Sequence, residues 1–122
     1  MTQSFVIPGR LPGMNEYTAA QRYNRYKGAA MKREAQRLVA FCLRGLTPVE
    51  VPVRLCYTYY EKNRRRDLDN ISGFAHKVVQ DALVEKGILK GDGWRHVTGM
   101  TDVFAIDKEC PRIEVSIITE EA

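Results

Sequence analysis

A continuous apolar stripe between Ile71 and Leu83 constrains the fold more than any other feature of the sequence. Its members recur at i, i+3, i+4, i+7, i+8, i+11 and i+12: Ile71, Phe74, Ala75, Val78, Val79, Ala82 and Leu83. This spacing predicts an amphipathic helix with one buried side, and Gly87 follows as a helix stop. The rest of the chain must therefore supply an apolar surface on which this helix packs.

Four segments have the composition or alternation of β-strands and can supply that surface. The first is Gln3–Ile7, and the second is Val51–Tyr60, which alternates with period two. Pro52 indicates either the beginning of a strand or the edge of a sheet. Val97–Ile106 and Arg112–Thr119 follow, and their pattern fits an antiparallel pair with one buried face.

A second amphipathic helix is predicted from about Ala29 to Arg44, and the residues before it, as far as Gly28, read as a long loop. Loops of this length inside a compact domain are uncommon unless they are functional or mobile. The loop interleaves cations with aromatic side chains: Arg22, Arg25 and Lys27 with Tyr17, Tyr23 and Tyr26. Such a mixture can bind phosphates and stack on bases. The equally weighted alternative is a solvated loop whose tyrosines pack at the edge of the core.

Length and composition limit the class of protein. The chain has 122 residues, of which 44% are hydrophobic and 28% charged, which fits one α+β domain over residues 1–122. We predict the order β-α-β-α-β-β, with a four-stranded mixed sheet packed by two helices. The formal net charge of +4 is only weak evidence for a nucleic-acid partner. The three cysteines lack zinc-site spacing, and no apolar run reaches the roughly 20 residues of a membrane span. A cytoplasmic location is therefore expected.

A strongly charged segment directly precedes the apolar stripe. Lys62, Arg64, Arg65 and Arg66 are followed at once by Asp67 and Asp69. Basic groups suit a polyanion, whereas clustered carboxylates suit a hard cation such as Mg²⁺. Capping of the helix explains one aspartate but not both. In a strand-to-helix turn the two carboxylates can converge on one ion.

Helical geometry limits which later residues can join Asp69. Three residues share its face at about 100° and 1.5 Å per residue: Gly73, His76 and Gln80. Lys77 lies about 80° around the helix and about 12 Å along it, and Asp81 lies about 18 Å along it. Asp81 is therefore expected to pair with Lys77 at i and i+4, and His76 is expected to be a surface histidine. Asp92 lies between two glycines and fits either a turn or a site.

Taken in order, these segments resemble the RusA-type Holliday junction resolvases, small dimeric endonucleases often carried by phages and prophages. The shared pieces are a strand ending in IPGRLPG with Asn15 soon after it, a basic run into DLDN, a helical K-x-x-x-DAL and an acidic turn after a glycine. The resemblance covers nearly the whole chain. It implies a Mg²⁺-dependent enzyme that resolves four-way DNA junctions by paired phosphodiester hydrolysis, acts as a homodimer and uses no small-molecule cofactor.

The resemblance also implies roles for individual residues. Asp67, Asp69 and Asp92 would bind Mg²⁺, and Lys77 would match the essential helical lysine of the family. In the family pattern that lysine comes four residues earlier, where this chain has Gly73, and Gly91 stands where the family often has the first of two aspartates. The residues expected at the nucleic acid are Asn15, Arg22, Arg25, Lys27, Lys62, Arg64, Arg65 and Arg66.

Two other functions remain open on the sequence. In a non-catalytic module that binds branched nucleic acid, the aspartates would only cap and turn the chain. In a Mg²⁺-dependent enzyme acting on small phosphate esters, so many dispersed cations would not be needed. A non-catalytic binding module should keep its full affinity and function when Asp67 and Asp69 are changed to Asn, unlike a nuclease. An enzyme that acts on small phosphate esters should not bind DNA.

Overall fold

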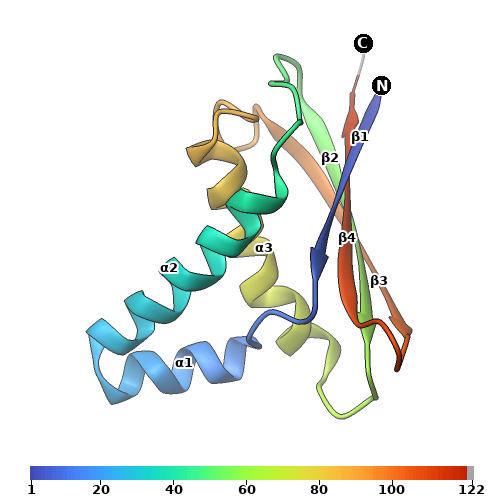
Figure 1. The fold of residues 1–122 in the computed structure, drawn as a ribbon. Coiled ribbons are helices and arrows are strands. Elements are labelled where there is room, and N and C mark those ends of the chain that lie inside the picture. The colour runs from blue at the N-terminus through green and yellow to red at the C-terminus, as the bar shows by residue number, and fades with distance from the viewer. Residues whose placement is uncertain (121–122) are drawn as a thin grey trace.

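A computed structural model of the chain describes residues 1–120 and shows an α+β fold (Figure 1). The elements are β1 (Thr2–Pro8), α1 (Met14–Tyr23), α2 (Arg25–Cys42), β2 (Val53–Glu61), α3 (Leu68–Glu85), β3 (Val97–Ile106) and β4 (Arg112–Thr119). The predicted four-stranded mixed sheet is confirmed. The prediction of two helices was wrong, because three helices cover one face of the sheet.

The strands lie in the order β1-β4-β2-β3. β2 and β3 are parallel neighbours, joined through α3 as a βαβ crossover, whereas β4 is antiparallel to both β1 and β2. The expected β3–β4 pair is therefore absent from the described sheet, since β2 lies between these two strands. β2 is central, so Pro52 precedes the start of a strand and does not indicate an edge.

The predicted loop as far as Gly28 was wrong from Met14 onward, because Met14–Tyr23 form α1 and Arg25 begins α2. The Gly13 N–H donates to Glu16 Oε1 at 3.2 Å, and the Asn24 side chain accepts from the Lys27 N–H at 2.7 Å. These contacts begin α1 and α2 respectively. Only Tyr17 and Ala20 of α1 are buried, so its sequence carries no continuous apolar stripe.

The core lies between the helices and the sheet. All seven members of the predicted stripe of α3 are buried, as are the inward positions of β2: Val53, Leu55, Tyr57 and Tyr59. The positions Ile113, Val115 and Ile117 of β4 pack beside them. Helix α3 is therefore packed on the sheet along its length, and its opposite face is directed away from the sheet.

The cysteines Cys42, Cys56 and Cys110 are free, as expected. Within residues 1–120, no helix combines the length and apolarity needed to cross a membrane.

Candidate active site

Asp67 and Asp69 lie at the N-terminus of α3 with exposed side chains. Asp67 is the N-cap residue, but its carboxylate makes no capping hydrogen bond; only its carbonyl oxygen accepts from the Ile71 N–H, at 3.1 Å. Neither carboxylate forms an ion pair or side-chain hydrogen bond within residues 1–120. Capping therefore does not account for either aspartate, and a helix N-terminus favours negative charge at this position.

Asn70, the last residue of the DLDN segment, holds this helix end against α1. The Asn15 N–H donates to Asn70 Oδ1 at 2.7 Å. A Cβ atom on Gly13 would lie 2.7 Å from the same oxygen, so the close approach requires glycine there. The Asn70 amide thereby links the Pro-Gly turn before α1 to the two aspartates.

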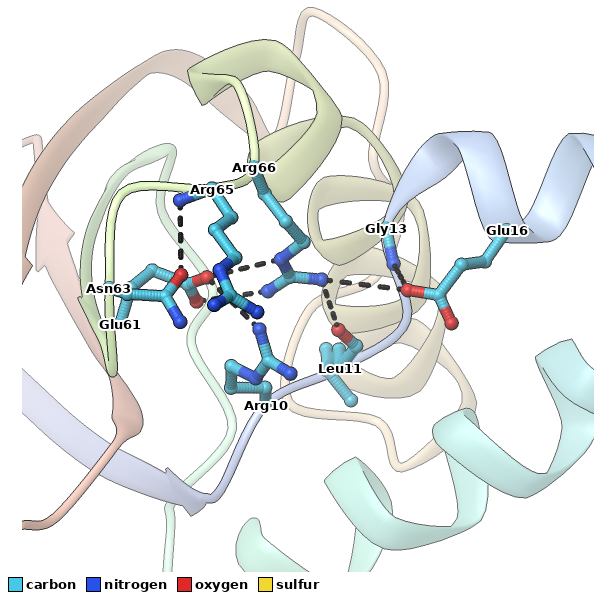
Figure 2. A network of polar contacts seen from close by, with 8 residues as sticks. All are labelled: Arg10, Leu11, Gly13, Glu16, Glu61, Asn63, Arg65 and Arg66. Atoms are coloured by element: carbon cyan, nitrogen blue, oxygen red, sulfur yellow. Dashed lines mark hydrogen bonds and ion pairs between the residues drawn. The ribbon is translucent and has the colours of Figure 1, made fainter. Parts of the chain in front are cut away.

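Arg66 points inward and is held by a buried carboxylate (Figure 2). Its Nε and Nη2 donate to the two oxygens of Glu61 at 3.1 and 2.9 Å, and its Nη1 donates to the Leu11 carbonyl at 3.0 Å. The Glu61 side chain is 6% exposed, and Arg10 lies 3.6 Å from it. This bidentate pair neutralises the charge of Arg66 and joins β2 to the segment before α1.

The other cations of the basic run, Lys62, Arg64 and Arg65, are exposed. The Arg65 N–H is held by Asn63 Oδ1 at 3.0 Å. Arg64 and Asp67 line one cleft of about 630 Å³, which is also bounded by Phe104, Ala105 and Ile106 of β3. Positive charge therefore lies beside the first aspartate.

Lys77 and Asp92 come together in a second cleft of about 290 Å³, lined by Gly73, His76, Lys77, Gln80, Asp81 and Asp92. α3 is continuous, so the four additional residues before Lys77 add one helical turn. They move Lys77 about 6 Å along the axis and only about 40° around it from Gly73. The chain thus retains a lysine on nearly the same helix face.

The predicted pairing of Asp81 with Lys77 was wrong. Asp81 pairs with Lys32 of α2 at 2.6 Å, since α2 packs directly against α3. Lys77 is exposed and has no ion pair with any described residue. At Gly73, a Cβ atom would lie 3.2 Å from Met14 Cε, so α1 covers part of the helix face where the family pattern places its lysine.

The second departure from the family pattern lies in the segment around Asp92. A Cβ atom on Gly91 would lie 2.7 Å from His96 Cδ2, so a larger residue at position 91 would require this imidazole to shift. Asp92 itself is exposed, and no described group pairs with its carboxylate. The adjacent Trp94 is 97% exposed.

The cations predicted to contact nucleic acid in this segment, Arg22, Arg25 and Lys27, lie where α1 ends and α2 begins. This corner of the molecule is far from the sheet (Figure 1). Lys27 Nζ lies 4.5 Å from the ring centroid of Tyr23, and Arg25 donates to the Tyr26 hydroxyl at 3.0 Å. Tyr23 and Tyr26 are 74% and 70% exposed, and Arg22 is exposed nearby. In contrast, Tyr17 packs on Phe74 in the core. Packing at the core is therefore confirmed for Tyr17, whereas phosphate binding and base stacking by the exposed residues stay a prediction.

Sequence reasoning missed Asp102 on β3. Its Oδ1 accepts from the Tyr59 hydroxyl at 2.9 Å and lies 2.7 Å from His76 Nε2. His76 was expected to be an ordinary surface histidine, yet it lines the cleft of Lys77 and Asp92. The contact joins residues 26 positions apart, so no local spacing indicated it. The inward position of Asp102 on β3 was the only available signal.

The donor chemistry of Asp67, Asp69 and Asp92 fits a hard divalent cation, because all three are exposed carboxylates without a described partner. The described part of the chain contains no group of three His, Cys, Asp or Glu residues arranged to enclose a metal. Mg²⁺ is commonly bound by one or two carboxylates, with water and substrate phosphate as further ligands. The residues therefore fit the cation in donor type, but the structure places Asp67 in the cleft of Arg64 and Asp92 in the cleft of Lys77, and it does not bring the three carboxylates together in one cleft.

Comparison with known protein families identifies the family to which the chain belongs. A sequence model described as Endodeoxyribonuclease RusA matches residues 12–118, from the turn before α1 into β4. The matched range includes all four residues predicted to be catalytic: Asp67, Asp69, Lys77 and Asp92. No protein with a curated function matches the chain. On the family match, the chain belongs to the RusA family of endodeoxyribonucleases and is a phosphodiester hydrolase of the Holliday junction resolvase type.

Proposed function

We propose that the chain cleaves four-way DNA junctions in a Mg²⁺-dependent reaction on the exposed face of α3. Asp67, Asp69 and Asp92 would hold the ion, and Lys77 would contact the phosphate. One observation carries this assignment: the three carboxylates have no partner among the described residues, and Lys77 shares a cleft with Asp92. Carboxylates left exposed and unpaired beside cations are suited to bind a metal together with a phosphate.

The bound ion would activate a water molecule and neutralise charge on the leaving oxygen. The residues of the chain supply the rest of the site. The Lys77 ammonium would stabilise charge on the phosphate oxygens, and Arg64, which lines the cleft of Asp67, would contact the adjacent backbone phosphate. The products expected of this reaction are a 3′-hydroxyl and a 5′-phosphate.

We assign DNA backbone contacts to two groups of exposed cations. One is Lys62, Arg64 and Arg65 beside α3, and the other is Arg22, Arg25 and Lys27 where α1 meets α2. Such contacts depend on salt and carry little sequence information. Tyr23 and Tyr26 are exposed beside the second group and can stack on unpaired bases. Arg66 is not assigned a DNA contact, because Glu61 binds its guanidinium. The Asn15 side chain is exposed, and we keep it among the proposed DNA contacts.

We further propose that the chain acts as a homodimer. A four-way junction has near two-fold symmetry, and a two-fold dimer places one site on each of two opposing strands. Light scattering coupled to size-exclusion chromatography is expected to give twice the chain mass of 13.9 kDa. A monomer that stays monomeric on junction DNA would contradict this part of the proposal.

Asp69→Asn tests the assignment of the site. Cleavage of a synthetic junction in Mg²⁺ is expected to fall by at least about 100-fold. Junction binding measured in EDTA is expected to stay equal or become tighter, because a negative charge near the phosphates is removed. Glu85→Gln, a neutralised carboxylate at the other end of the same helix, serves as the matched control and should cleave normally.

Two results would contradict the proposal. Loss of binding together with cleavage in Asp69→Asn would indicate a damaged fold or a binding role for this residue. Tight junction binding without any cleavage, equal in the wild type and in Asp69→Asn, would instead indicate a non-catalytic binding module.

A further inference from the structure

His76 and Asp102 form a contact that the assigned site residues do not account for. His76 Nε2 lies 2.7 Å from Asp102 Oδ1, and the His76 ring packs on Tyr57 with the ring centroids 4.7 Å apart. The side chains of His76 and Asp102 are 23% and 24% exposed. The imidazole is therefore held at Nε2 by Asp102 of β3 and is packed against the Tyr57 ring of β2.

The hydrogen bonds around Asp102 determine the tautomer of His76. An ionised carboxylate only accepts hydrogen bonds, so the contact requires a proton on Nε2 and leaves the lone pair of a neutral ring on Nδ1. Burial, together with the charge of Asp102, raises the pKa of Tyr59, so its hydroxyl stays protonated and donates to Asp102. A carboxylate placed in this way orients the imidazole.

His76 also lies beside two of the proposed site residues. It lines the cleft that contains Lys77 and Asp92, and it lies on the helix face of Asp69, about two turns further along α3. Among residues 1–120, the contact with Asp102 is the one hydrogen bond of its ring. An imidazole used only for packing would not need a carboxylate to hold it at the wall of this cleft.

We propose that His76, oriented by Asp102, is a catalytic residue that accepts a proton from the attacking water; this inference rests on the proposed function. Nδ1 takes the proton as the water oxygen forms its bond to phosphorus. The bond between phosphorus and the 3′-oxygen breaks, and the electron pair stays on that oxygen. Lys77 then gives a proton to the 3′-oxygen, and exchange with solvent restores both side chains.

The dependence of cleavage on pH tests this role. His76→Gln is expected to lower kcat by about 10²- to 10⁴-fold and to remove the rise in rate through the histidine range, with junction affinity unchanged within about threefold. Added imidazole should partly restore cleavage by His76→Ala, an effect that a purely structural histidine would not show. Cleavage by His76→Gln within about threefold of wild type, or an equal loss of binding, would overturn the proposal.

Asp102→Asn provides a second test, in which Asp102 acts as a positioning residue. Exchange of the carboxylate for an amide removes the acceptor that fixes the proton on His76 Nε2, so the neutral ring should populate both tautomers and the rate should fall by about 10- to 100-fold. Glu114→Gln, on β4 and bonded to Arg112, is the matched control and should change neither. The other charged or titratable groups around His76 are Tyr57, Tyr59, Lys77, Asp81 and Asp92.

A measurement on the metal-free protein separates this inference from the proposed function. The chain has two histidines, so His76→Gln assigns the imidazole resonances in NMR spectra. The nitrogen chemical shifts are expected to show the Nε2–H tautomer in wild type and a mixture of tautomers in Asp102→Asn, and equal tautomer populations would overturn the orienting role. If wild type cleaves and His76→Gln cleaves equally well, only the inference fails. If wild type does not cleave at all, the proposed function fails with it.

Discussion

Neighbouring residues of one type have different environments in this protein. Arg65 and Arg66 are adjacent in the basic run, yet Arg65 is exposed whereas the Arg66 side chain is 15% exposed and bound to Glu61. The two side chains differ because the buried Glu61 binds the Arg66 guanidinium, whereas no described side chain pairs with that of Arg65. A phosphate contact by Arg66 would take its guanidinium away from this carboxylate.

The two arginines should therefore respond differently to alanine. Arg66→Ala is expected to lower the free energy of unfolding by about 3 kcal/mol, because the buried Glu61 would lose its bidentate partner and keep only the longer contact with Arg10. Arg65→Ala should change this free energy by less than about 0.5 kcal/mol, but should weaken junction binding and reduce its salt slope by about one. Urea unfolding and binding titrations at several salt concentrations measure both effects. Equal stability of the two variants would contradict the structural role of Arg66.

At the scale of elements, hydrophobic periodicity predicted the helix and the strands in which one face is buried. The stripe of α3 and the strands Val97–Ile106 and Arg112–Thr119 agree with the structure because burial of one face imposes a period. α1 has only two buried residues, and contacts with Glu16 and Asn24 define the start of α1 and of α2, so no period was present. A helix of this kind depends on capping and on contact with α3.

Asn70 should be central to that contact. Asn70→Ala is expected to cost about 1 kcal/mol of stability, because the Asn15 N–H loses its acceptor at the start of α1. Asn70→Asp keeps an acceptor oxygen and should retain most of the stability. Thermal or urea unfolding of the two variants measures the difference, and an Asn70→Ala variant as stable as wild type would refute the link between α1 and α3.

The turn between β3 and β4 gives a prediction for pH. Hydrogen bonds from Arg112 and from the Cys110 N–H hold the pKa of Asp107 below its ordinary value. A carboxyl whose pKa is lower in the folded than in the unfolded chain stabilises the fold above its unfolded pKa, and this contribution is lost as pH falls through the folded pKa. Asp107→Asn should therefore be less stable than wild type at about pH 7 in urea unfolding, and the difference should shrink as the pH falls below the ordinary aspartate pKa of 3.8. A constant difference would contradict this.

At the scale of the whole molecule, the candidate site combines parts that are distant in sequence. The DLDN segment, Lys77 and Asp92 were predicted together from the resemblance, and their chemistry could be anticipated from residue type. The contact of His76 with Asp102 could not, because it depends on β3 lying parallel beside β2. Strand order follows from how all the segments pack, and no single segment encodes it.

The central claim is that two sites cut opposing strands of one junction. A supercoiled plasmid that extrudes a cruciform tests it directly, since two cuts within the lifetime of one complex give linear DNA and a single cut gives a nicked circle. With Mg²⁺, wild-type protein is expected to give linear product as the main species, and Asp69→Asn or added EDTA should give none. Nicked circles as the main product, or equal cutting of a plasmid without the cruciform, would contradict this claim.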